Sequence, residues 1–215
     1  MATTIYLIRH GESEANRQAV FLGQGDLGLT QVGLRQARIT AGYLKNHVRR
    51  PDVIYASDLS RAYDTASCTA EAFDMPIIKD LQLREIDTGL WEGVSFTTLA
   101  ERYPDSYGVW LRDIGYARCD GGESVEELQQ RVVLAVTRIA KKHENSVVFL
   151  FTHATPIRVF AAHCLKKTLG EIHTIPWVAN ASVTKAVYEK GTFRLDEYGR
   201  FDFMKGEATE LPANV

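Results

Sequence analysis

Arginine and histidine side chains follow three apolar runs of this chain, at the points where buried strands are expected to end. The runs span residues 4–8, 53–56 and 146–151 and are rich in β-branched and aromatic residues. Open α/β sheets bind ligands at the carboxyl ends of their parallel strands. We therefore expect one pocket to collect the polar side chains that follow the runs. These side chains are Arg9, His10, Arg61 and His153.

Such a pocket suits a tetrahedral dianion such as a phosphoryl group. Guanidinium groups offer paired donors whose geometry matches that of phosphate oxygens. Because side chains supply the positive charge, and no carboxylate cluster of the kind that holds Mg²⁺ is visible, we expect no metal or other cofactor. The two histidines could instead bind zinc, but the neighbouring arginines would repel that cation.

His10 can serve as a nucleophile in this setting if its imidazole is neutral. The nearby cations Arg9 and Arg61 disfavour the imidazolium ion and should lower the pKa of His10. A local backbone carbonyl is expected to hold the other ring nitrogen and so fix the tautomer. Gly11, which follows directly, allows another part of the backbone to approach closely.

A leaving alcohol needs a proton donor, and the loop 83–93 offers three carboxylates. We choose Glu85 over Asp87 and Glu92, although spacing alone does not rank them. A bound phosphate dianion would raise the pKa of a neighbouring carboxyl group and keep it protonated for donation.

Strands and helices are expected to alternate along the chain. Alternation of this kind predicts an α/β fold with a mostly parallel central sheet and helices on both faces, a three-layer α/β/α sandwich. A loop is expected over 17–29, and Thr30 is the expected N-cap of a helix whose apolar face reaches residue 44. The other expected elements are a helix over 60–73, a strand at 77–78, a helix from a Ser124–Glu127 capping box to 142, a helix over 156–165 and a hairpin of 182–188 with 193–198.

Residues 94–122 show only two short amphipathic pieces, near 95–103 and 105–113. We predict that this segment is a small helical lid inserted into a single domain that spans 1–215. The polar tail, about 206–215, is expected to be mobile.

The composition is ordinary for a globular protein of 215 residues, with a net charge of −2 and a pI of about 6.3. This charge gives no indication of nucleic-acid binding or of a membrane surface. No window approaches the roughly 18 apolar residues of a membrane span, and no secretory signal is visible. Together with three widely spaced cysteines that are expected to be free thiols, this predicts a cytoplasmic location.

Five motifs, in order along residues 5 to about 185, resemble those of the histidine phosphatase superfamily, which has the phosphoglycerate mutase-like fold. The motifs are Arg9-His10-Gly11-Glu12; Ser57 to Ala62 with Thr65-Ala66; Leu83 and Glu85 with Gly89, Glu92 and Gly93; Gly121-Gly122-Glu123-Ser124; and Thr152-His153. Residue 154 departs from the pattern, since Ala stands where the family usually has Gly.

The resemblance implies a role for each matched residue. His10 would become phosphorylated, and Glu85 would donate the proton. The implied phosphoryl ligands are Arg9, Arg61 and His153, with Asn16 and the backbone at Ala154 as further phosphate contacts. Gly23 and Gln24 would approach the substrate.

The implied activity is metal-independent hydrolysis of a small phosphorylated metabolite in two steps, through a phosphohistidine. The chain resembles the broad-specificity and α-ribazole phosphatases more than the mutases, which usually carry a longer insertion and a different continuation of the acid motif. A phosphoglycerate mutase and a non-catalytic phospho-ligand-binding relative remain the alternatives.

Overall fold

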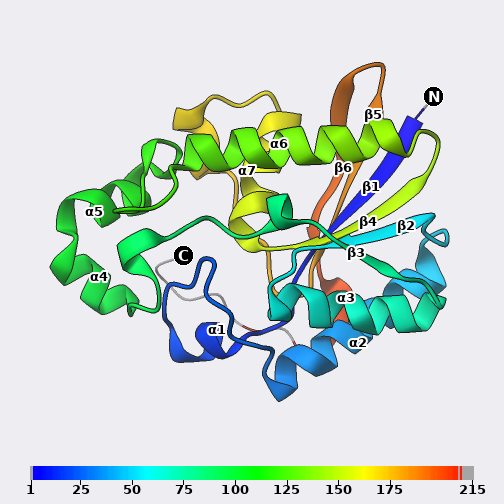
Figure 1. Ribbon diagram of the computed structural model, residues 1–215, viewed down its shortest axis with the longest axis horizontal. Helices are drawn as coiled ribbons and strands as arrows, with labels where there is room; N and C mark the ends of the chain where they lie inside the picture. The colour runs from blue at the N-terminus through cyan, green and yellow to red at the C-terminus, as the bar shows by residue number, and fades with distance from the viewer. Residues whose placement is uncertain (1, 208, 210–215) are drawn as a thin grey trace.

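One mixed six-stranded sheet forms the centre of the computed structural model, which describes residues 2–207 and 209 (Figure 1). The strand order is β3-β2-β4-β1-β5-β6. β1 to β4 are parallel, and β5 and β6 form an antiparallel hairpin at one edge. The strands are β1 (Ala2–Arg9), β2 (Val53–Ala56), β3 (Ile77–Lys79), β4 (Val147–Thr152), β5 (Val183–Glu189) and β6 (Thr192–Arg200). The predicted, mostly parallel α/β sheet is confirmed.

Two pairs of helices cover the two faces of the sheet. α2 (Gln31–His47) and α3 (Ser60–Phe73) pack on one face, while α6 (Val125–Lys142) and α7 (Ala154–Cys164) pack on the other (Figure 1). The apolar side chains of β1, β2 and β4 alternate between the two resulting cores. The sandwich has three layers, as the alternation of strands and helices predicted.

Local capping signals set the starts of α2 and α6 as expected. Thr30 accepts a hydrogen bond from the Gly33 amide at 3.0 Å, and Ser124 and Glu127 form a reciprocal capping box. These side chains satisfy backbone amides that have no partner within the helix.

Two helix boundaries differ from the prediction. A short helix, α1 (Glu14–Gln18), occupies the start of the predicted loop, because Ser13 and Asn16 form a capping box there. α7 begins at Ala154 rather than at Pro156. Proline is accommodated in this first turn because the amides of a first turn have no partner within the helix.

The segment 94–122 contains two short helices, α4 (Phe96–Arg102) and α5 (Pro104–Arg112), which lie beyond one end of the sheet (Figure 1). Its role as a lid, and the treatment of the chain as one domain, stay predictions. The 3₁₀ turns are η1 (Leu81–Leu83), η2 (Gly89–Trp91), η3 (Ile114–Tyr116), η4 (Leu169–Thr174) and η5 (Asp202–Met204).

Most of the predicted tail lies outside the described residues. Where the tail is described, the Glu207 carbonyl accepts a hydrogen bond from Gln36 at 2.7 Å. Within residues 2–207 and 209, none of the helices has the length and hydropathy needed to cross a lipid bilayer.

Candidate active site

The register of the parallel strands places the polar residues that follow them side by side. Arg9 pairs with Thr152 in the ladder between β1 and β4. The His10 amide then donates to the Thr152 carbonyl at 3.1 Å, so His10 and His153 become neighbours. Their ring centroids are 5.2 Å apart.

His10 is buried, with 4% of its surface exposed, and its tautomer is fixed by the backbone. Nδ1 lies 2.7 Å from the Gly11 carbonyl oxygen. Because a carbonyl only accepts, Nδ1 carries the proton and Nε2 keeps its lone pair. Burial lowers the pKa of His10 well below its usual value, and the charges of Arg61 and Arg9 lower it further. The imidazole is therefore neutral at physiological pH.

His153 is fully buried, and its two ring nitrogens differ in environment. Nε2 is 2.9 Å from the Ser57 hydroxyl, whereas Nδ1 has no partner in the described part of the chain. Burial lowers the pKa of His153, with further contributions from Arg61 and His10. An unpartnered polar nitrogen inside a cluster of cations is suited to an anionic ligand.

Arg9 donates from Nη1 to the Val178 carbonyl at 2.5 Å, while its Nε has no partner within the described residues. Burial lowers the pKa of Arg9 to about 10, so the guanidinium keeps its charge at neutral pH. Arg9 therefore offers a buried positive charge with an unused donor.

Arg61, with 2% of its surface exposed, holds the loop 23–25 in place. Its Nη2 donates to the Gly23 carbonyl at 2.7 Å, and its Nη1 to the Gly25 carbonyl at 2.9 Å. The Glu92 carboxylate accepts from the amides of Gly23 and Gln24 at 3.0 and 3.1 Å. The loop 23–25 is thus held by a positively charged side chain, Arg61, at its carbonyls and by a negatively charged one, Glu92, at its amides.

Position ranks the three carboxylates that spacing left unranked. The carboxylate of Glu92 already accepts hydrogen bonds from the loop 23–25. Asp87 is exposed to solvent and accepts a hydrogen bond from the Gly89 amide. Glu85 is buried at the pocket, where its two oxygens accept from the amides of Ile86 at 2.9 Å and Thr155 at 3.3 Å.

Burial raises the pKa of Glu85, although these two hydrogen bonds and Arg61 act against the shift. The raised pKa agrees with the predicted role of Glu85 as a proton donor. Its main cause is burial, whereas the sequence-based argument relied on a bound phosphate.

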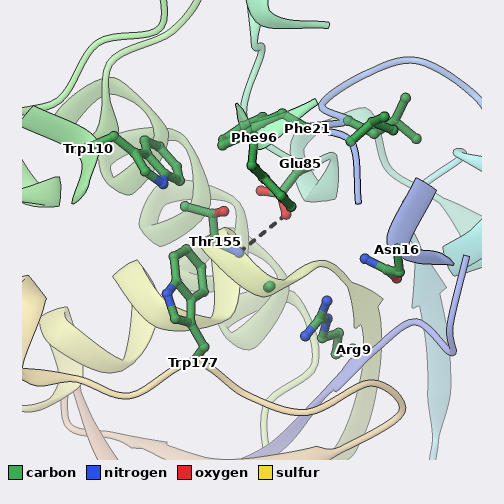
Figure 2. Close-up of a pocket in the computed structure, with 11 residues that line it drawn as sticks. Arg9, Asn16, Phe21, Glu85, Phe96, Trp110, Thr155 and Trp177 are labelled. Atoms are coloured by element: carbon green, nitrogen blue, oxygen red, sulfur yellow. Dashed lines mark hydrogen bonds between the residues drawn. The ribbon is translucent and has the colours of Figure 1, made fainter. Parts of the chain in front are cut away.

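Asn16 is oriented by partners that sequence reasoning missed. Its Oδ1 accepts from the Ser13 amide and from Asn180 Nδ2, both at 3.1 Å. This leaves the amide nitrogen of Asn16 free to point into the pocket (Figure 2). Asn180 also donates to the His10 carbonyl at 3.2 Å. The sequence holds no signal for this link, because 164 residues separate the two asparagines.

A pocket opens beside Glu85, between the sheet edge and the segment 94–122 (Figure 2). His10, Arg61, His153, Gly23 and Gln24 do not belong to its lining. The lining residues are Arg9, Asn16, Val20, Phe21, Leu22, Glu85, Phe96, Trp110, Ala154, Thr155 and Trp177. Over residues 2–207 and 209, no group of three or more His, Cys, Asp or Glu side chains is placed to hold a metal ion.

Comparison with known proteins identifies a match to the family model of the histidine phosphatase superfamily (branch 1) over residues 5–200. A bifunctional protein of Mycobacterium tuberculosis is 36% identical over 175 residues, which are 80% of this chain and 47% of that protein. The chain thus spans about half the length of that relative.

Two further matches cover most of their own length. Phosphoserine phosphatase 1 of Hydrogenobacter thermophilus is 35% identical over 161 residues, 74% of each chain. The solved structure of Bacillus stearothermophilus YhfR superposes with a TM-score of 0.89 at 29% identity, covering 94% of this chain and 99% of that one.

Proposed function

Because this chain belongs to the histidine phosphatase superfamily, we propose that it hydrolyses phosphomonoesters of small metabolites through a phosphohistidine on His10, with Glu85 as general acid and base. The observation that carries the proposal is the state of His10. A buried, neutral imidazole keeps a lone pair at Nε2 and interacts electrostatically with two buried guanidinium groups, those of Arg61 and Arg9. Arg61 also interacts with the buried carboxyl group of Glu85, whose pKa is raised.

In the first step Nε2 of His10 attacks phosphorus, and the bond from phosphorus to the ester oxygen breaks. Glu85 gives its proton to the departing alkoxide, so an alcohol leaves and the enzyme holds a phosphohistidine. In the second step Glu85 takes a proton from water, whose oxygen attacks phosphorus. The P–N bond breaks and its electron pair returns to Nε2. Inorganic phosphate is released, and neutral His10 and protonated Glu85 are regenerated.

The remaining polar groups stabilise charge on the three non-bridging oxygens. Arg9, Arg61 and His153 supply buried donors, and the amide nitrogen of Asn16 and the backbone N–H of Ala154 add two more. We propose that no metal is required, because these side chains already supply the positive charge. Ala in place of Gly at 154 keeps the backbone donor.

The relatives support a small phosphorylated substrate, since one of them is named as a phosphoserine phosphatase. We propose that the segment 94–122 acts as a lid over a single-domain core, because it contributes Phe96 and Trp110 to the pocket wall. Once the alcohol has left, water must enter the pocket; otherwise the phosphoryl group would be transferred from His10 back to the alcohol.

Phosphate release from a panel of phosphomonoesters, measured with EDTA present, tests this function. We expect wild-type protein to release phosphate and to form an acid-labile phosphoenzyme, and His10→Ala to do neither. His173→Ala is the matched control, because the His173 Nδ1 also contacts a backbone carbonyl, at 2.6 Å, but on the surface. Full activity in His10→Ala would refute the mechanism. Interconversion of 2- and 3-phosphoglycerate without release would favour a mutase.

A further inference from the structure

The lining of the pocket combines two kinds of residue. The polar lining consists of Arg9, Asn16, Glu85 and Thr155, with the backbone of Ala154. The apolar lining contains Val20 and Leu22 together with four aromatic side chains, which we call the aromatic rim. The rim consists of Phe21, Phe96, Trp110 and Trp177, all four of which are labelled in Figure 2.

The aromatic rim is one packed unit rather than a set of separate side chains. The ring of Phe21 lies 5.0 Å from that of Trp110 and 6.0 Å from that of Phe96, in edge-to-face contacts. Trp110 and Trp177 are nearly parallel, with centroids 6.2 Å apart. Because these contacts are already made within the protein, a ligand can use the rim without first ordering it.

Arg158 contacts the aromatic rim from outside the pocket lining. Its guanidinium carbon lies 4.2 Å from the centroid of the Trp177 ring, and its Nη2 donates to the His173 carbonyl at 3.3 Å. Arg158 is 6% exposed and does not line the pocket. Its positive charge therefore orients the indole of Trp177 and is not presented to a ligand.

Positive charge is confined to the polar lining. Among the described residues that line the pocket, Arg9 is the single cation, and it is one of the proposed phosphate ligands. Arg112 and Arg118 of the segment 94–122 are exposed and lie outside the lining, and Arg118 pairs with Glu127 at 2.6 Å. A carboxylate on the leaving group would thus find no partner at the rim.

We propose that the aromatic rim binds the leaving group of the phosphomonoester and selects flat, apolar alcohols over alcohols that carry a carboxylate. This inference rests on the proposed hydrolysis at His10. Apolar area removed from water against the rim favours an aromatic leaving group. A carboxylate would lose its hydration there without gaining a cationic partner.

Three alkyl phosphates test the selection without a large change in leaving-group chemistry: 2-phenylethyl phosphate, ethyl phosphate and O-phosphoserine. We expect kcat/KM for 2-phenylethyl phosphate to exceed that for phosphoserine by about 30-fold or more, with ethyl phosphate between them. Equal or faster hydrolysis of phosphoserine would overturn the selection while leaving the proposed function intact.

Trp177→Ala should reduce the preference for 2-phenylethyl phosphate over ethyl phosphate to within about threefold, chiefly through KM. Trp177→Phe should restore part of it. Tyr116→Ala is the matched control, because Tyr116 is an exposed aromatic residue that lies outside the pocket lining. An unchanged preference in Trp177→Ala would contradict the role of the rim.

Calorimetric binding of two phosphonates separates this inference from the proposed function, because a P–C bond is not hydrolysed. Phenylphosphonate should bind at least about tenfold more tightly than phosphonoacetate, and Trp177→Ala should abolish the difference. This order would support the rim even if none of the esters were cleaved, an outcome that would refute only the proposed hydrolysis. The reverse order would overturn the inference whatever the activity.

Discussion

The guanidinium of Arg61 donates a hydrogen bond from Nη2 to the carbonyl oxygen of Gly23 at 2.7 Å. The side chain proposed to hold the phosphoryl group therefore also fixes the loop 23–25. Glu92 completes this arrangement by accepting from the amides of Gly23 and Gln24. We therefore expect phosphate affinity and loop position to be coupled through this one buried arginine.

Replacing Arg61 should impair both functions. We expect Arg61→Ala to raise the activation barrier by roughly 3–4 kcal/mol, as loss of one charge-stabilising donor typically does. Arg61→Lys should keep the charge but lose the paired carbonyl contacts, and should fall between wild type and Arg61→Ala. Steady-state kinetics together with proteolysis of the loop would show whether the two defects occur together. Near-normal activity in Arg61→Ala would contradict the assignment.

Removing the carboxyl group of Glu85 should separate the two chemical steps. With p-nitrophenyl phosphate, whose leaving group needs no proton, we expect Glu85→Gln to form the phosphoenzyme but to hydrolyse it slowly. Rapid-mixing experiments should then show a burst of about one equivalent of p-nitrophenolate. Asp87→Asn, at an exposed carboxylate of the same loop, should keep wild-type turnover. Wild-type steady-state rates in Glu85→Gln would rule out its proposed role.

Acidification should destabilise the folded protein through His10 and His153. Burial lowers both pKa values below 6.5, so the unfolded chain binds protons that the folded chain does not. The free energy of unfolding should therefore fall as pH decreases below 6.5, with each histidine contributing up to about 1.4 kcal/mol per pH unit.

Glu85 acts in the opposite sense, because its raised pKa favours the folded state at low pH and reduces stability as pH rises above 4.5. Comparing His10→Asn with wild type at each pH cancels this contribution. We expect His10→Asn to lose less stability than wild type between pH 6.5 and 5 in urea titrations. Parallel pH profiles would show that His10 titrates normally in the folded protein.

Asn180 should control phosphate affinity through the orientation of Asn16. Without the amide of residue 180, Asn16 loses one of the partners that direct its nitrogen into the pocket. Loss of one such hydrogen bond predicts a weakening of inhibition by inorganic phosphate of about fivefold in Asn180→Ala. Adding Asn16→Ala to that variant should have little further effect, and additive losses would show that the two residues act independently.

Replacement by alanine should change the free energy of unfolding in opposite directions at two glycines of α2. A Cβ atom at Gly33 would lie 2.0 Å from the Glu12 carbonyl oxygen, whereas one at Gly42 would meet nothing within 4 Å. We expect Gly33→Ala to lower the free energy of unfolding by about 1–3 kcal/mol. Gly42→Ala should raise it by up to about 1 kcal/mol, because alanine favours the helix. Chemical denaturation of both variants gives the comparison, and equal stabilities would contradict the packing argument.

The sequence alone determined the elements whose signals lie within a few residues. β2 spans 53–56 and α3 spans 60–73, the same ranges that the apolar patterns predicted. The Thr30 cap and the Ser124–Glu127 capping box also appeared as expected. The periodicity of apolar residues and the capping of helices both depend on residues only a few positions apart, so they can be recognised in the sequence directly.

The tertiary structure alone decided how distant residues share their hydrogen bonds. Spacing left Glu85, Asp87 and Glu92 equivalent. They were distinguished by the burial of Glu85 at the pocket, the exposure of Asp87 and the contact of Glu92 with a loop 69 residues away. The link between Asn180 and Asn16, and the stacking of Trp177 on Trp110, likewise join segments that are far apart in the chain. Such pairings depend on strand register and on the packing of whole elements, which no local pattern in the sequence encodes.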